Sequence, residues 1–353
     1  MNAPSSNHLF PYEWRLADGF PAPGIQANGR KVFGTFVCGG GSAMGYKLAG
    51  YDYLGGVEFD ARVAEVYRTN LKPKYLFVED IRKTVERDDL PEELYHLDIL
   101  DGSPPCTLFT LNRGKKREDS WGKSKVWKEG AGEQSLDDLC FVWESLVEKL
   151  RPKVCLMENV EGMLKGGAKW YLRLLCDKLS RAGYSSQIFL LNSATMGVPQ
   201  SRRRVFVIGR RRDLDLPNLS LNFHEAPIVF GDIKEEGAPS DLKPVTLRRW
   251  EKRRPGDAKM GSIAKRVEGK ESDFSTVIIY DDRVAPCCTT AKNVLYSEPR
   301  YETQRERERE STFPIDYNFA GTSVPYLTGM CVPPVMTAQI AHQIQMQWFT
   351  KID

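Results

Sequence analysis

The sequence has few histidines, no paired cysteine motif and no long apolar run, and each absence narrows the class of protein. Its four histidines lie far apart, so a zinc site would have to be assembled from scattered pieces of chain. The eight cysteines include no Cys-x-x-Cys pair and no framework spacing. We therefore expect no bound metal and a reducing, cytoplasmic setting.

No apolar run approaches the roughly 18 to 20 residues that span a bilayer, and no signal-peptide pattern is present, so we expect no membrane association. Hydrophobic residues make up 41% and charged residues 27%, which is typical of a globular protein with a packed core. The net charge of +3 is small for a nucleic-acid binder. It is the difference between 50 basic and 47 acidic residues, and it does not show the local runs of basic residues.

Strand and helix signals alternate over the first two thirds of the chain. Strands are expected at 31–37, 53–59, 96–101, 154–157 and 205–208, and helices at 136–150 and 170–182. This alternation predicts an α/β fold with a doubly wound, mostly parallel sheet that binds ligands at the carboxyl ends of its strands.

Four segments follow from the same pattern. Residues 1–30 are an irregular lead-in, expected to pack through Phe10, Tyr12 and Trp14, and 31–209 form the main domain. Residues 210–300 are turn-rich and locally basic, which indicates a smaller second domain. Residues 301–353 contain a terminal helix near 334–349 and are expected to return to the main domain.

The expected strand at 96–101 runs into a rigid turn, Pro104-Pro105-Cys106, that fixes a thiol near the carboxyl edge of the sheet. A buried structural cysteine is the ordinary interpretation of such a residue. A second strand delivers Glu158 and Asn159 to the same edge, although Glu/Asn pairs often only cap loops.

A third motif, Gln200-x-Arg202-x-Arg204, opens another strand. Because side chains of a strand repeat every two residues, Arg202 and Arg204 are expected to face the same side. Solvated surface charge is the alternative interpretation.

In this order, the three motifs resemble those of the DNA cytosine-C5 methyltransferase family. The resemblance extends over about 31–209 and again over about 283–344. A later block also resembles the family: Thr303, Arg305, Glu306, Arg309, Thr312, Phe313, Pro314, Asp316, Tyr317 and Phe319. The family's terminal block is matched by Gly329, Val332, Pro333 and Pro334. Each motif alone is weak, but five in the right order are specific.

The resemblance implies a covalent mechanism. C5 of cytosine is not nucleophilic, so the thiolate of Cys106 adds to C6 first. Glu158 would donate or share a proton at N3, Arg204 would hold O2, and Arg202 would support them. Asn159 belongs to the same motif and is counted with the catalytic residues. The target base must be flipped out of the duplex before it can react.

The cofactor-binding part of the expected site lies around a glycine turn. Its residues, which would allow a ligand to approach the backbone, are Phe36, Gly39, Gly40 and Gly41. Glu58 ends the next expected strand, where ribose-binding acids usually lie. The turn lacks a Gly-x-Gly-x-x-Gly phosphate cradle in register, which favours S-adenosyl-L-methionine over a dinucleotide. By resemblance, Phe59 would lie against the adenine, Asp80 and Ile81 would reach its edge, and Pro104 would complete the site.

Three positions depart from the family pattern: Cys38 in the glycine turn, Thr107 after the nucleophile, and Met330-Cys331 in the terminal block. They could affect cofactor fit, loop closure or target positioning. Residues 112–134 are rich in lysine and arginine with two tryptophans, so we expect a mobile loop that closes over the flipped nucleotide and contacts phosphates.

We therefore expect a DNA cytosine-C5 methyltransferase that is monomeric, acts on double-stranded DNA and recognises its target through residues 210–300. An RNA (tRNA) cytosine-C5 methyltransferase is the first alternative, because a relative of the family modifies tRNA with similar residues. A methyltransferase-like protein that binds DNA without turnover is the second, in view of the three departures. The target sequence, and a cognate restriction endonuclease as partner, stay open.

Overall fold

The chain folds into two compact units, each assembled from three separated segments. The computed structural model describes residues 8–105, 124–126, 133–135, 138–269, 272 and 276–352. The small unit comprises Met1–Gly19, Asn192–Arg202 and Phe223–Met336, and the large unit comprises Phe20–Leu191, Arg203–Asn222 and Thr337–Asp353. The four segments expected from the sequence were divided where the chemical motifs stop and resume. Their boundaries therefore differ from those of the two units. The roles assigned to those segments stay predictions.

A seven-stranded sheet forms the centre of the large unit, in the order β3-β2-β1-β4-β7-β10-β8. Neighbours from β3 to β7 are parallel, whereas β10 runs antiparallel to β7. The strands are β1 (Lys31–Thr35), β2 (Asp52–Glu58), β3 (Tyr75–Val78), β4 (Ile99–Gly102), β7 (Val154–Val160), β8 (Tyr184–Asn192) and β10 (Arg203–Arg211). The expected doubly wound, mostly parallel α/β fold is confirmed.

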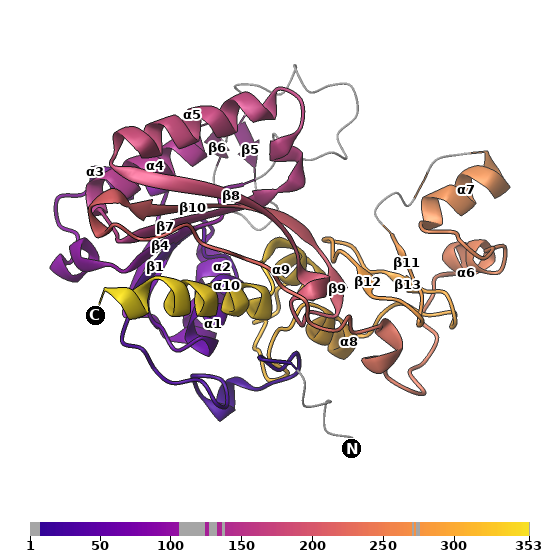
Figure 1. Ribbon diagram of the computed structural model, residues 1–353. Helices are drawn as coiled ribbons and strands as arrows, with labels where there is room; N and C mark the ends of the chain where they lie inside the picture. Colours follow the sequence, from indigo (N-terminus) through magenta and orange to yellow (C-terminus); the bar gives the residue numbers. More distant parts are fainter. Residues whose placement is uncertain are drawn as a thin grey trace. The chain divides into compact units, whose positions relative to one another are not determined.

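Helices cover both faces of this sheet, with α3, α4 and α5 on one face and α1, α2 and α10 on the other (Figure 1). Their bounds are α1 (Gly41–Leu48), α2 (Ala61–Leu71), α3 (Ile81–Glu86), α4 (Leu139–Leu150), α5 (Ala168–Arg181) and α10 (Pro334–Gln347). Helix α4 packs on the sheet because one of its faces is apolar. The buried residues of that face recur at helical spacing: Trp143, Leu146, Val147 and Leu150. They pack into the core cluster that includes Phe33, Leu100 and Met157 of the strands.

The small unit contains little regular structure. Its helices are α6 (Pro244–Trp250), α7 (Met260–Glu268), α8 (Gln304–Glu310) and α9 (Val324–Met330), and its short strand pairs are β9 (Gln200–Ser201) with β12 (Ala285–Pro286) and β11 (Ile278–Ile279) with β13 (Val294–Leu295). Single 3-10 turns in the chain are η1 (Leu16–Asp18), η2 (Glu92–His96), η4 (Glu161–Leu164), η5 (Ser193–Thr195), η6 (Arg212–Leu214), η7 (Phe230–Asp232) and η8 (Phe349–Lys351).

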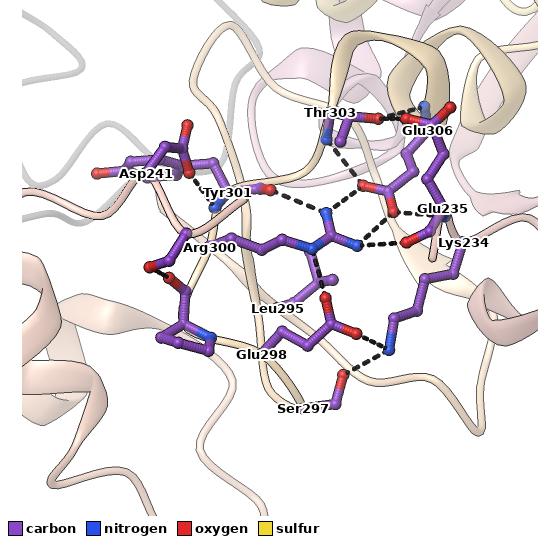
Figure 2. A network of polar contacts seen from close by, with 12 residues as sticks. Lys234, Glu235, Asp241, Leu295, Ser297, Glu298, Arg300, Tyr301, Thr303 and Glu306 are labelled. Carbon is purple, nitrogen blue, oxygen red and sulfur yellow. Dashed lines mark hydrogen bonds and ion pairs between the residues drawn. The ribbon is translucent and has the colours of Figure 1, made fainter. Parts of the chain in front are cut away.

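A buried ionic network around Arg300 lies in this unit (Figure 2). The Arg300 guanidinium, 1% exposed, donates to both carboxylate oxygens of Glu306 at 2.8 and 2.7 Å. Glu306 also accepts from the backbone N–H of Thr303 at 2.8 Å, and together these two residues form a capping box at the start of α8. Because one carboxylate serves both the cap and the arginine, the local fold depends on this ion pair.

The N-terminal segment packs into the small unit, as the sequence predicts for its aromatic residues. Phe10 is fully buried and Trp14 is 7% exposed. The Trp14 indole N–H donates to the carbonyl of Thr312 at 2.9 Å, and Asp316 accepts from the backbone N–H groups of Leu16 and Ala17. Among the helices that the structure describes, none is both long and apolar enough to cross a membrane.

Candidate active site

The carboxyl ends of four parallel strands gather the candidate residues at one edge of the large unit's sheet. The glycine turn follows β1, Glu58 is the last residue of β2, Pro104 lies two residues beyond β4, and Glu158 lies near the end of β7. Ligands of open α/β sheets bind at this edge. The fold therefore places both expected ends of the site, cofactor and catalytic, along the same sheet edge.

The proposed nucleophile Cys106 lies outside the described residues, as does Thr107. So does most of the basic segment 112–134, in which the structure describes only the backbone of the short antiparallel pair β5 (Ser124–Val126) and β6 (Glu133–Ser135). The description of the catalytic turn ends at Pro105, directly before the thiol. The role of Cys106 therefore rests on the sequence and on the residues around the turn.

Glu158 and Arg204 form an ion pair on neighbouring strands. Arg204 Nε lies 2.9 Å from Glu158 Oε1, and their side chains are 14% and 10% exposed. The register explains the pairing: Phe206 of β10 is opposite Glu158, and Arg204, two residues earlier, projects from the same face. A carboxylate and a guanidinium are thus held together in a site from which most water is excluded.

Asn159 ties β7 to the catalytic turn. Its side-chain N–H donates to the carbonyl of Pro104 at 3.2 Å, and its side-chain oxygen accepts from the backbone N–H of Val160 at 2.9 Å. Asn159 is 1% exposed. Its contacts hold the backbone at Pro104, near the end of the described part of this turn.

Arg202 and Arg204 do not share one strand. Strand β9 ends at Ser201 and β10 begins at Arg203, so Arg202 lies at the break between them. Its guanidinium, 2% exposed, donates to the carbonyl of Gly329 at 3.1 Å within the small unit. The expectation that both arginines face the same side of one strand fails, because the backbone leaves strand geometry at Arg202.

Gln200 of the same motif is also a structural link within the small unit. It donates to the carbonyl of Glu310 at 3.1 Å and accepts from the backbone N–H of Cys288 at 3.0 Å. Gln200 is fully buried. The first two polar residues of the motif therefore make hydrogen bonds within the small unit, whereas Arg204 pairs with Glu158.

The turn between β1 and α1 has a left-handed backbone at three positions: φ is 57° at Phe36, 48° at Cys38 and 80° at Gly40. A side chain at Gly40 would place its Cβ 2.4 Å from Leu71 Cδ1, which would have to shift, and the left-handed backbone there favours glycine. Cys38, where the family commonly has glycine, adopts a conformation that favours glycine. The turn brings bare backbone to the sheet edge.

Glu58 is fastened to this turn. Its two carboxylate oxygens accept from the backbone N–H groups of Cys38 at 2.8 Å and Asp60 at 2.9 Å. Burial raises the pKa of Glu58 to about 7, and the backbone hydrogen bonds oppose that rise. The carboxyl group therefore titrates near neutral pH.

The remaining cofactor candidates surround the ends of β2 and β3. Asp80 caps α3 by accepting from the backbone N–H of Arg82 at 2.9 Å, and Ile81 beside it is 2% exposed. Phe36 and Phe59 are partly exposed. Carboxylates with aromatic surfaces and a glycine turn suit S-adenosylmethionine, which is a cationic nucleoside without phosphate groups.

Sequence reasoning missed Asp101, a carboxyl group buried in β4 at 3% exposure. The Tyr46 hydroxyl donates to its Oδ1 at 3.4 Å. Burial, and next the negative charge of Glu158, raise the pKa of Asp101 to about 7. The available signal was an acid at the end of an otherwise apolar strand. Within the described ranges, no group of three or more His, Cys, Asp or Glu side chains is arranged to hold a metal ion.

The mostly parallel sheet with helices on both faces matches the fold of S-adenosylmethionine-dependent methyltransferases. The family profile described as C-5 cytosine-specific DNA methylase matches residues 31–346, and the chain belongs to this family.

Curated relatives are named type II methyltransferases, and a solved structure shares the fold. A type II methyltransferase of Fusobacterium nucleatum, M.FnuDI, is 30% identical over 197 residues, covering 55% of this chain and 50% of the relative. Here the chain spans about half the length of the curated relative that it matches. M.NgoFVII, a type II methyltransferase of Neisseria gonorrhoeae, is 26% identical over 348 residues, covering 90% of this chain and 87% of the relative. The crystal structure of a candidate DNA modification methyltransferase encoded within an E. coli prophage superposes with a TM-score of 0.64 at 19% identity, covering 90% and 99% of the two chains.

Proposed function

We propose that this protein is an S-adenosylmethionine-dependent DNA (cytosine-5-)-methyltransferase that flips a target cytosine out of duplex DNA and methylates it at C5. The observation that carries the proposal is the Glu158–Arg204 ion pair, whose partners lie 2.9 Å apart and join β10 to β7, the neighbour of the strand β4 that leads into the Pro104-Pro105 turn. Membership of the cytosine-C5 family supports the same reaction.

The chemistry assigns a separate task to each residue. The Cys106 thiolate adds to C6 of the cytosine, which makes C5 nucleophilic. Glu158 donates or shares a proton at N3 as negative charge builds on the ring, and Arg204 holds O2. Loss of the C5 proton and expulsion of the thiolate then release the methylated base. Asn159 holds the Pro104 carbonyl and thereby positions the nucleophile. Arg202 acts through the small unit, by holding the backbone at Gly329.

The cofactor supplies the methyl group when it is bound. Glu58 would accept hydrogen bonds from the ribose hydroxyls, and Gly39, Gly40 and Gly41 would let the ligand approach the backbone. Phe36 and Phe59 would contact the ligand through their rings. Asp80, Ile81 and Pro104 complete the set of candidate cofactor contacts.

Target choice is assigned to residues 210–300, because the chemical motifs stop at 209 and resume only after about 283. Exchanging this segment with that of a relative should change the methylated sequence. An unchanged site in a well-folded exchange variant would remove the assignment. The type II names of the relatives support a cognate restriction endonuclease as partner.

The decisive experiment uses DNA in which fluorine replaces the C5 hydrogen of the target cytosine. Elimination is then blocked after methyl transfer, so protein and DNA should stay joined during denaturing electrophoresis when S-adenosylmethionine is present. Cys106→Ala should abolish the joined species, and Glu158→Gln should slow its formation severely. Cys176→Ala, which removes a partly buried thiol from α5, is the matched control and should still form it.

The same assay separates the alternatives. Fluorinated RNA that becomes joined in place of DNA would favour the RNA methyltransferase. A folded protein that binds DNA but forms neither methylated product nor joined species would be a binding protein without turnover. DNA methylation by the Cys106→Ala variant would contradict the covalent mechanism.

A further inference from the structure

The segment 243–269 of the small unit concentrates positive charge. It contains nine Lys or Arg and three Asp or Glu, a formal charge of +6, whereas the whole chain carries only +3. The other residues therefore sum to −3. Helices α6 and α7 with their connecting turn make up this segment, which we call the basic hairpin, and Figure 1 shows the two helices next to each other.

Two of the three acidic residues of the hairpin form ion pairs with arginines of the same segment. Glu268 of α7 accepts from Arg249 of α6 in a two-pronged contact at 2.7 and 2.6 Å. Asp257 of the connecting turn accepts from Arg266 in the same manner, at 2.8 Å for each contact. Planar two-pronged pairs of this kind are geometrically specific. They fix the two helices relative to each other, and Glu251 is then the one acid of the segment outside these pairs.

Six of the seven remaining cations are exposed to solvent. Six basic residues of the hairpin are exposed and take no part in these two pairs: Lys243, Arg248, Lys252, Arg254, Lys259 and Lys265. In a solvated helical pair without a ligand, this density of like charge is unfavourable, because neighbouring cations repel one another. A polyanion that binds across the hairpin would relieve that repulsion.

The hairpin is also a firm platform. Met260 and Ile263 of α7 are fully buried against Ile278 and Val294 of the strand pair β11–β13. The Trp250 indole N–H donates to the carbonyl of Leu295 at 2.7 Å. Cations held by a packed scaffold lose less conformational freedom on binding than cations on a loose loop.

The nearby aromatic rings already have partners. The Arg253 guanidinium lies 3.3 Å from the centroid of Trp250 and 4.9 Å from that of Tyr296. Tyr296 stacks on Tyr280 at 4.5 Å, and Arg283 lies 4.3 Å from the centroid of Tyr280. Proteins that bind single strands use open aromatic faces on which bases stack. Rings occupied in this way favour contacts with a sugar-phosphate backbone instead.

We propose that the basic hairpin binds the phosphate backbone of duplex DNA and supplies affinity without reading sequence. The inference rests on the proposed function. It gives two parts of residues 210–300 different roles: the hairpin anchors the duplex, and other parts of the small unit select the target. Duplex DNA presents one negative charge per about 1.7 Å of its axis, which matches a surface of closely spaced cations.

The test removes four charges that are exposed and, within the described part of the chain, form no ion pair: Lys243→Gln, Arg248→Gln, Lys252→Gln and Lys259→Gln together. DNA affinity is measured over a series of salt concentrations on cognate and random duplexes. The plot of log affinity against log salt should become shallower by about 0.9 for each phosphate that the variant no longer neutralises, for both duplexes alike. The methylated sequence, mapped at low salt, should not change.

A matched control carries the same loss of charge on the large unit, where Lys72, Lys169, Arg173 and Arg181 are equally exposed. Their replacement by glutamine should leave the salt dependence as in the wild type. A hairpin variant whose salt dependence equals that of the wild type overturns the proposal. A hairpin variant that methylates a different sequence also overturns it, because the hairpin would then read bases.

Failure of the inference and failure of the proposed function are distinguishable. If the protein is not a DNA methyltransferase, the wild type itself will not methylate DNA or become joined to fluorinated DNA. If only the inference is wrong, the wild type will do both, and the hairpin variant will bind DNA with an unaltered salt dependence.

Discussion

Asp101 should make the stability of the protein depend on pH in a way that a single substitution removes. The carboxyl group is buried in β4, and its pKa rises from 3.8 to about 7 on folding. A difference of about three in pKa corresponds to about 4 kcal/mol between the charged and the neutral form. The folded chain therefore favours the protonated acid strongly.

The direction follows from the order of the two values. Below pH 3.8 the acid is protonated in both states and the folded protein has its full stability. As pH rises toward about 7, the unfolded chain ionises while the folded chain does not, so stability falls. Above that pH both states are ionised and the loss levels off.

Asp101→Asn keeps the shape and an oxygen that can accept from Tyr46, but it cannot ionise. Between pH 5 and 8 the free energy of unfolding should therefore rise relative to the wild type, by roughly 2 to 3 kcal/mol over that interval. Urea unfolding at each pH measures this difference. Asp52→Asn, at an exposed position in β2, is the control, and its profile should run parallel to the wild type. Parallel profiles for Asp101→Asn as well would refute the reasoning.

Three further predictions concern the cofactor end and the small unit. Glu58→Ala should weaken S-adenosylmethionine binding, measured by calorimetry, by about 1–3 kcal/mol and leave DNA affinity unchanged. In the wild type, the affinity for S-adenosylmethionine should rise from pH 6 to 8 as Glu58 ionises around its pKa of about 7. Full affinity for S-adenosylmethionine in the variant would remove Glu58 from the ribose site. Gly40→Ala should lower the free energy of unfolding by about 1–2 kcal/mol because of the left-handed backbone, and unchanged urea denaturation would contradict this. Arg300→Met should lower the free energy of unfolding by about 3–5 kcal/mol, because it leaves Glu306 buried and unpaired. Adding Glu306→Gln should restore part of that free energy. An unaltered melting curve for the single variant would refute the coupling of the two residues.

The central strands could be predicted from sequence because they are buried on both faces. The expected strands at 31–37, 53–59 and 154–157 overlap β1, β2 and β7. The two strands of the sheet that were not anticipated, β3 and β8, are its edges. An edge strand is covered less completely, and Val78, Ile188 and Leu190 are all at least 39% exposed. Such strands lack the continuous apolar run by which a buried strand is recognised.

The position of a candidate site residue could be predicted where the residue lies at or near the end of a strand, and not where packing decides. Glu58 and Glu158 fall at strand ends, so topology alone delivers them to one edge. Asp101 accepts from Tyr46 of helix α1, which lies 55 residues away in sequence. Arg202 depends on a break in the strand and on a carbonyl 127 residues away. Neither contact leaves a local pattern.

The interleaving of the two units has a consequence for synthesis on the ribosome. The chain passes from one unit to the other five times, and the last passage adds Thr337–Asp353 to the large unit. Tyr51 donates to the carbonyl of Ala341 and Arg30 to that of Phe349, so residues made early wait for partners that lie 290 and 319 residues further along the chain. Closing such long loops is slow. A nascent chain therefore keeps apolar surface open until Thr337–Asp353 has been made, and this is the interval in which chaperones would protect it from aggregation.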